Sequence, residues 1–115
     1  MNRAENNNID LSIVTISTNE GDQLVDSARS VMAGIEGLNV EYFVIDNNST
    51  DETEDVTRQY DKIQLIQHRE RVGFSTNNNL ALERSSGRYV LLLNPDTILD
   101  PETLPFMVKY MDDYP

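Results

Sequence analysis

The sequence predicts a three-layer α/β protein, with helices packed on both faces of a mostly parallel sheet. Two observations predict this class. Four short segments rich in Val, Ile, Leu and aromatic residues recur along the chain, as expected for buried strands. Each is followed by polar turn residues and then by apolar residues at helical spacing. The resulting βαβαβαβα order, with right-handed crossovers, makes a parallel sheet.

The first half of the chain contains two predicted strands and the helix between them. Leu11 to Ile16 and Val40 to Ile45 have the β-branched and aromatic content of strands. The intervening helix should begin near Asp22 and end around Gly34 and Gly37. Its apolar positions fall on one face: Leu24, Ala28, Val31, Met32 and Ile35.

Two further helices and a strand follow. Ser49 and Glu52 fit a capping box, in which two side chains satisfy free N–H groups at a helix start, so a short helix is expected over about 51–60. Ile63 to Ile66 predicts a third strand, and residues 74–85 predict the next helix. The Asn triplet at 77–79 is unusual in a helix, because Asn is a poor helix former. It suggests side chains needed for hydrogen bonding near the helix start.

The fourth predicted strand, Tyr89 to Leu93, is a continuous apolar run, which predicts burial on both faces of the sheet. Pro95 has no N–H for a sheet and should end the strand. Asp100 is the expected N-cap of the last helix and Pro101 its first residue. Pro105 is expected to kink or shorten this helix. Its apolar face would comprise Leu104, Met107, Val108 and Met111.

Length and composition restrict the class of protein. With 115 residues there is room for one domain, expected over 11–115 after a disordered, polar lead-in at 1–10. A net charge of −11 argues against nucleic acid or an anionic membrane as partner. The absence of Cys excludes disulfides and thiolate–zinc sites. No apolar run is long enough for a signal peptide or a membrane span, so we expect a cytoplasmic location.

Polar clusters follow three of the strands, at residues 15–20, 46–51 and 94–96. In a parallel sheet these ends meet at one edge, where such sheets bind ligands. Asp96 could hold a divalent metal that in turn holds a diphosphate, or it could close a turn. Asp46 could bind a ligand or could close a turn, whereas Ser49 and Thr50 are better explained as caps. Glycine-rich phosphate loops are absent, and the lone His68 is expected to be solvated.

Four segments, in order, are similar to motifs of a known family. They are S-I-V-T-I-S-T-N-E at 12–20, F-V-I-D-N-N-S-T-D at 43–51, R-V-G-F-S-T-N-N-N-L-A at 71–81 and L-L-L-N-P-D-T at 91–97. The chain resembles the amino-terminal, nucleotide-sugar-binding half of family 2 glycosyltransferases, which have the GT-A fold. It looks closest to the branch that contains proteins assigned as rhamnosyltransferases. The resemblance covers nearly all of the chain.

The resemblance implies a Rossmann-like half of a GT-A fold and a set of site residues. Asp46 would contact the base, and Asp96 stands in the position of the D-x-D metal motif, with Asn94 where many members have Asp. One carboxylate is enough for Mg²⁺ or Mn²⁺ when substrate phosphates complete the site. The nucleotide-binding residues implied are Thr15, Ser17, Asn19, Glu20, Asp46, Asn48, Gly73, Phe74, Asn78, Asn79 and Asn94.

The function implied is transfer of a hexose from a UDP- or dTDP-linked nucleoside diphosphate sugar to an acceptor. In the family this is a metal-assisted, inverting reaction of cell-surface polysaccharide biosynthesis, and the full-length enzyme can act at the inner face of the membrane. The acceptor site and the catalytic base lie in a second half that would follow Pro115. We therefore expect this chain to bind the donor without turnover, to contain no identifiable catalytic residue, and to self-associate through apolar surface left uncovered.

Two other hypotheses share some of these features. A receiver-type signalling domain has a similar size, acidity and strand-end aspartates. It needs a pair of acids after the first strand and a Lys after a later strand, whereas the lysines here are Lys62 and Lys109, and neither follows a strand. A non-catalytic nucleotide-binding module would differ from the enzyme only in the length of the full gene product.

Overall fold

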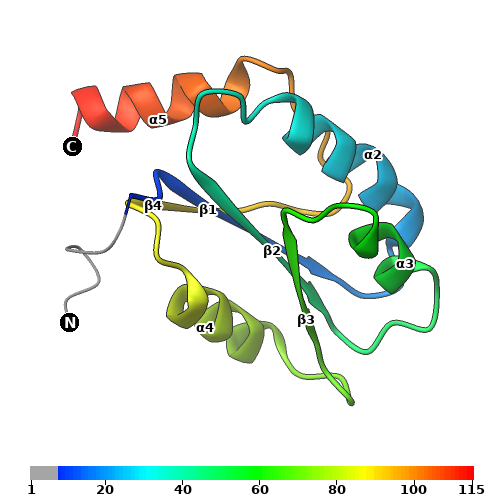
Figure 1. The fold of residues 1–115 in the computed structure, drawn as a ribbon. Coiled ribbons are helices and arrows are strands. Elements are labelled where there is room, and N and C mark those ends of the chain that lie inside the picture. Colours follow the sequence, from blue (N-terminus) through cyan, green and yellow to red (C-terminus); the bar gives the residue numbers. More distant parts are fainter. Residues whose placement is uncertain (1–7) are drawn as a thin grey trace.

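The computed structural model describes residues 8–115, so most of the predicted lead-in at 1–10 lies outside the described residues. The sheet has four parallel strands in the order β3-β2-β1-β4, which confirms the predicted fold class (Figure 1). The strands are β1 (Leu11–Ser17), β2 (Val40–Asp46), β3 (Ile63–Gln67) and β4 (Tyr89–Leu92). Each lies within one or two residues of its predicted bounds.

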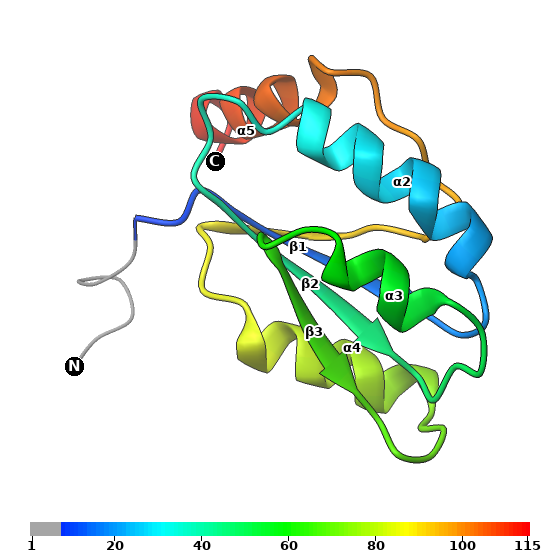
Figure 2. The ribbon, with the colours of Figure 1, turned by 45° about the vertical axis from the view of Figure 1, so that its right-hand side comes forward.

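The described helices are α2 (Gly21–Ala33), α3 (Thr53–Arg58), α4 (Phe74–Arg84) and α5 (Thr103–Asp113). Figures 1 and 2 show α2, α3 and α5 over one face of the sheet and α4 alone below the other. This unequal cover leaves two cores of different size. Among the described residues, no helix is both long and apolar enough to cross a membrane.

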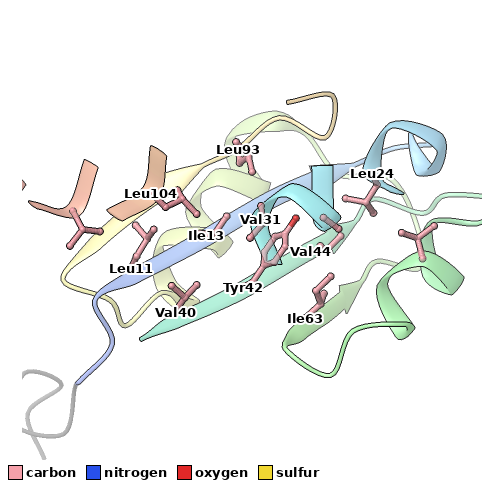
Figure 3. Close-up of a cluster of buried hydrophobic side chains, with 13 residues drawn as sticks. Leu11, Ile13, Leu24, Val31, Val40, Tyr42, Val44, Ile63, Leu93 and Leu104 are labelled. Carbon is pink, nitrogen blue, oxygen red and sulfur yellow. The ribbon is translucent and has the colours of Figure 1, made fainter. Parts of the chain in front are cut away.

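The larger core lies between the sheet and the three helices (Figure 3). Ile13 of β1 and Val44 of β2 are fully buried there against Leu24 of α2 and Leu104 of α5. The helical spacing identified the buried face of α2 correctly, since Leu24, Ala28 and Val31 all lie in this core. Met32 and Ile35 are partly buried at its periphery.

The smaller core lies between the sheet and α4. Val14, Phe43 and Ile45 alternate along β1 and β2 with the residues of the larger core, and they pack against Ala81 of α4. Residues i and i+2 of a strand share a face, so these two central strands are buried on both sides. Their continuous apolar character follows from this position.

The prediction that β4 is buried on both faces is wrong. Tyr89 and Leu91 pack on the larger core, but Val90 and Leu92 are 39% and 50% exposed on the other side. The physical reason is the position of β4, which pairs only with β1 at the edge of the described sheet. On that face the sheet is covered by α4 alone, and this one helix does not reach across all four strands (Figures 1 and 2). As predicted, the strand ends before Pro95.

The capping box at the start of α3 is also a wrong prediction. The helix begins at Thr53, and its N-cap Glu52 makes no side-chain capping bond. Asp51 takes the capping role, because its Oδ1 accepts hydrogen bonds from the backbone N–H and the hydroxyl of Thr53. Ser49 is instead used to connect two loops.

The last helix begins later than predicted, at Thr103, so Asp100 is not its N-cap and Pro101 is not its first residue. Residues 100–102 form a turn in which the N–H of Thr103 donates to the Asp100 carbonyl oxygen at 3.0 Å. This shift places Pro105 in the first helical turn, where backbone N–H groups have no partner within the helix. Pro105 therefore removes no helical hydrogen bond, and the helix continues to Asp113.

Gly87 fixes the approach of β4 to β1. Its N–H donates to Ser12 Oγ at 2.7 Å, and a Cβ atom at this position would lie 2.6 Å from the backbone nitrogen of Ser12. Only glycine allows so close an approach to another backbone. The carboxylate of Glu41 on β2 accepts from both Ser12 and Ser86, which joins the three segments.

Candidate functional site

An open cavity of about 460 Å³ lies at the carboxyl ends of β1 and β4. It is bounded by β1, the loop after it, the end of β2, the start of α4 and the segment after β4. The lining residues are Val14, Ile16, Thr18, Glu20, Asn47, Val72, Phe74, Asn77, Asn78, Leu92, Leu93, Asn94, Pro95 and Asp96. The predicted convergence of strand-end clusters therefore produces a real cavity.

The β4 side of the cavity presents Asp96. In the turn after the strand, the N–H of Thr97 donates to the Asn94 carbonyl oxygen at 3.1 Å, so the backbone closes this turn. Asp96 itself is exposed, and within residues 8–115 nothing donates a hydrogen bond to its carboxylate. The carboxylate is therefore available to a ligand.

Among residues 8–115, the lining carries negative charge and no positive charge. Glu20 contributes a second carboxylate, whose Oε1 accepts from the N–H of Thr18 at 3.3 Å, and no Lys, Arg or His is among the lining residues. Arg71 is exposed and is not part of the lining. Residues 8–115 contain no group of three His, Asp or Glu that could hold a metal by themselves.

Asp46, at the end of β2, has a different environment. It is 3% exposed, and its Oδ1 accepts a hydrogen bond from the Ser49 N–H at 2.9 Å. Asp46 therefore closes a turn, which was one of its two predicted roles: its side chain accepts a hydrogen bond from its own loop. Asp46 does not line the cavity, although its neighbour Asn47 does.

Asn47 holds the segment before α4, where Val72 forms part of the cavity wall. Its Nδ2 donates to the Val72 carbonyl oxygen at 3.2 Å, and its Oδ1 accepts from the Val72 N–H at 2.9 Å. The side chain thus pairs with a backbone unit as a neighbouring strand would. Because Asn47 is 9% exposed, water competes little for these bonds. Sequence reasoning missed this residue, since Asn after a strand looks like any turn former.

The loops after β1 and β2 are bonded to each other. Asn19 and Asn48 have left-handed backbones, with φ of 54° and 59°, which Asn tolerates better than most residues. Asn19 Oδ1 accepts from the Thr50 N–H at 2.7 Å, and the Asn19 N–H donates to Ser49 Oγ at 2.9 Å. Ser49 and Thr50 therefore bridge the loops, where caps were expected.

Asp51 completes this bridge. Its Oδ2 accepts from the Gly21 N–H at 2.9 Å, at the start of α2, while its Oδ1 caps α3. Partial desolvation acts to raise the pKa of Asp51, but hydrogen bonds from Thr53 and Gly21 outweigh it and lower the pKa below its usual value. The ionised carboxylate is thus stabilised by the fold.

The expectation that His68 is solvated is not confirmed, because its side chain has a specific partner. Its Nε2 lies 2.8 Å from Oδ1 of Asn77, which is 1% exposed and lines the cavity. The suggestion that the Asn triplet supplies hydrogen-bonding side chains is confirmed for Asn77. The partner of His68 could not be predicted from local sequence, because the two residues lie on different segments, the loop after β3 and α4.

The structure brings five of the twelve predicted site residues into the cavity lining: Glu20, Phe74, Asn78, Asn94 and Asp96. Seven lie outside it: Thr15 and Ser17, buried in β1; Asp46, buried at the end of β2; and Asn19, Asn48, Gly73 and Asn79, exposed in loops or on α4. Lining residues that were not among the predicted site residues include Thr18, Asn47, Val72 and Asn77.

The model of the family described as glycosyl transferase family 2 matches residues 12–115. The chain belongs to this family. Its similarity to TuaG of Bacillus subtilis (strain 168), whose name assigns it to teichuronic acid biosynthesis as a glycosyltransferase, is 32% identity over 105 residues. That match covers 88% of this chain and 41% of TuaG. The chain thus spans less than half the length of this relative.

Solved glycosyltransferase structures share the fold. TarS 1–349 of S. aureus, crystallised with UDP, superposes with a TM-score of 0.83 at 22% identity, over 92% of this chain and 33% of that one. A mannosyltransferase from Pyrobaculum calidifontis, in complex with GDP-Man and Mn²⁺, gives a TM-score of 0.80 at 22% identity, over 90% of this chain and 32% of that one. At such identities the likeness establishes the GT-A-type arrangement alone.

Proposed function

We propose that this family 2 glycosyltransferase domain binds a UDP- or dTDP-linked sugar in the cavity at the ends of β1 and β4. The observation that carries the proposal is the open carboxylate of Asp96 in a cavity of about 460 Å³ that Asn78 and Asn94 also line. That volume is in the range of small-molecule sites. TarS, which shares the fold, has been crystallised with UDP and with UDP-GlcNAc, which supports a nucleotide sugar as ligand.

The charge of the lining makes a divalent cation part of the proposal. A diphosphate entering a cavity with Glu20, Asp96 and no basic residue would meet repulsion from both carboxylates. Mg²⁺ or Mn²⁺ fits this donor set, because such ions are held by one or two carboxylates together with substrate phosphates. Asp96 would bind the ion, with Asn94 next to it, and the ion would neutralise charge on the leaving diphosphate.

The chain alone should bind the donor without transferring the sugar. In our proposal the acceptor site and catalytic base are supplied by sequence beyond these 115 residues, since the match to TuaG covers 41% of that protein. The wider role proposed is hexose transfer, with inversion, in cell-surface polysaccharide biosynthesis. The name of TuaG supports that setting.

Calorimetric titration tests the proposal. UDP and dTDP should each be titrated into the folded chain with Mn²⁺ and again with EDTA in its place. Saturable binding in the micromolar-to-millimolar range that requires Mn²⁺ is expected for at least one nucleotide. Absence of binding to either nucleotide, in a chain shown to be folded by circular dichroism, would contradict the donor-binding role.

A further inference from the structure

The helix α5 carries apolar side chains on two adjoining faces. Leu104 and Val108 are buried in the larger core. The second face is between 39% and 67% exposed and comprises Phe106, Met107, Tyr110, Met111 and Tyr114. A surface helix usually turns polar residues towards solvent, so this second face departs from the usual pattern. Apolar surface of this kind typically marks a contact with another protein segment.

Three aromatic rings form a continuous row along the second face. The ring centroids of Phe106 and Tyr110 lie 6.3 Å apart, and those of Tyr110 and Tyr114 lie 4.8 Å apart. Residues four apart share one side of a helix, which explains the row. Lys109 and Asp113 form a salt bridge with each other at 2.8 Å, which offsets their charges. The row therefore has little local net charge, although the chain as a whole carries −11.

This apolar face continues onto the open edge of β4. The N–H groups of Tyr89 and Leu93 donate towards β1, at 3.3 Å and 2.8 Å. Alternate N–H groups of a strand point to opposite sides, so those of Val90 and Leu92 point away from β1, where no strand within residues 8–115 pairs with them. An apolar groove of about 130 Å³ connects this edge with α5, and its lining comprises Leu11, Tyr89, Val90, Leu91, Leu104, Met107, Val108 and Met111.

We propose that the edge of β4 and the exposed face of α5 form the interface of a homodimer. The β4 strands of two copies pair antiparallel across a twofold axis perpendicular to the sheet, as a self-complementary interface requires. This axis places both α5 helices on the same side of the joined sheet, so that their aromatic rows meet above the paired strands. The groove is then filled by side chains of the second copy.

The area of the patch is sufficient for a dimer. The exposed parts of Val90 and the five α5 residues amount to roughly 600–700 Å² per copy, given that a whole aromatic side chain has about 150–250 Å². A standard interface buries about 800 Å² per partner, of which about 65% is apolar in homodimers. The inference is independent of the proposed function, because the groove shares no lining residue with the cavity that contains Asp96.

Sedimentation velocity of the 115-residue chain over a range of protein concentrations tests the proposal. We expect a reversible monomer–dimer equilibrium with a dissociation constant in the micromolar range. Because two copies with a charge of −11 each repel one another, raising the NaCl concentration should tighten the dimer several-fold. A chain that stays monomeric at every concentration and salt level overturns the proposal, as does a dimer that salt dissociates.

Substitutions locate the interface. Tyr110→Ser removes the middle ring of the row and should weaken the dimer by about tenfold or more. Val90→Lys places a charge on the pairing edge and should abolish the dimer. Leu82→Ser removes a comparably exposed apolar side chain from α4, outside the patch, and should leave the dimer intact. If Val90→Lys does not fold, the comparison of Tyr110→Ser with Leu82→Ser decides, and equal weakening by both overturns the assignment.

Hydrogen exchange tests the strand pairing itself. The amides of Val90 and Leu92 should exchange rapidly at concentrations where the chain is monomeric and become protected where it is dimeric. A dimer without added protection at these two amides would overturn the pairing of β4 with its copy.

Discussion

The ends of β2 and β4 carry the same residue type in opposite environments. Asp46 follows β2, is 3% exposed and bonds its own loop through Ser49. Asp96 follows β4, is exposed in the cavity, and its turn is closed by the backbone of Asn94 and Thr97. One loop uses its carboxylates to hold the fold together, and the other leaves its carboxylate for a ligand.

The two strand ends therefore have different roles in the site. The loop after β2 is connected to the loop after β1 and to α2 and α3 through Asn19 and Asp51. Asn47 of this loop lines the cavity, as do Thr18 and Glu20 of the loop after β1. The loop after β4 lies at the edge of the described sheet and has no such cross-connections to its carboxylate. Substitutions at the two ends should therefore affect different properties.

The largest effect should follow Asp96→Asn. Removing the charge of the one metal-facing carboxylate should weaken Mn²⁺-dependent UDP binding by about 100-fold or more, while the urea midpoint changes little. The reason is that the Asp96 side chain makes no hydrogen bond within residues 8–115 that the fold could lose. Calorimetry and urea denaturation measure the two effects. Unchanged UDP affinity would mean that the open carboxylate has no part in binding.

Asp51→Ala should have the opposite effect to Asp96→Asn: it should lower stability and leave UDP affinity nearly unchanged. It removes the acceptor for Gly21, and for the backbone and hydroxyl of Thr53, so the free energy of unfolding should fall by about 2 kcal/mol. Equilibrium urea unfolding followed by circular dichroism measures this loss. UDP affinity, corrected for the folded fraction, should stay within about twofold. A stable variant that lost UDP binding would remove the distinction between the two loops.

Asn47→Ala should show an intermediate result, because Asn47 follows β2 but lines the cavity. Loss of its two bonds to Val72 should lower the free energy of unfolding by about 1–2 kcal/mol and weaken UDP binding several-fold. Asn47→Asp is the matched variant: it keeps the acceptor for the Val72 N–H and loses the donor. If Asn47→Asp binds UDP as weakly as Asn47→Ala does, the hydrogen bond from Asn47 Nδ2 to the Val72 carbonyl oxygen is the one that UDP binding requires.

The smallest effect should be a pH dependence that belongs to the β2 side. The pKa of Asp51 is lowered in the folded chain, so its contribution to stability is present above the unfolded pKa of about 3.9 and is lost as pH falls through the folded value. Asp51→Asn cannot titrate. Thermal unfolding between pH 6 and pH 3 should show the stability gap between wild type and Asp51→Asn narrowing at the acid end. A stability difference that grows as the pH falls would contradict a lowered pKa of Asp51 in the folded chain.

Much of the fold could be predicted from local sequence. Strands such as Val40–Asp46 are mostly apolar because they have helices on both sides, and α2 shows its buried face at helical spacing. The exposure of Val90 and Leu92 could not be predicted in this way. An apolar run reports what a strand can bury, and it carries no information about whether a second layer covers it.

The site was predicted at the level of the sheet edge, with the GT-A resemblance adding individual residues such as Asp96 and Asn78. What could not be predicted were contacts between loops far apart in the chain. Asn47 with Val72 and His68 with Asn77 join residues on different segments of the chain, and three of these four residues line the cavity. Turn formers that bond one another have the same composition as turn formers that bind a ligand.

The most direct test of the central claim locates the metal. Amide signals of the ¹⁵N-labelled chain should be recorded with UDP and substoichiometric Mn²⁺, whose unpaired electrons broaden nearby resonances. The account predicts selective broadening around Asn94, Asp96 and Thr97 that requires UDP and is absent in Asp96→Asn. Broadening centred on Asp46 and Asp51, or the same pattern with and without UDP, would contradict the claim that the loop after β4 holds the metal of a nucleotide-sugar site.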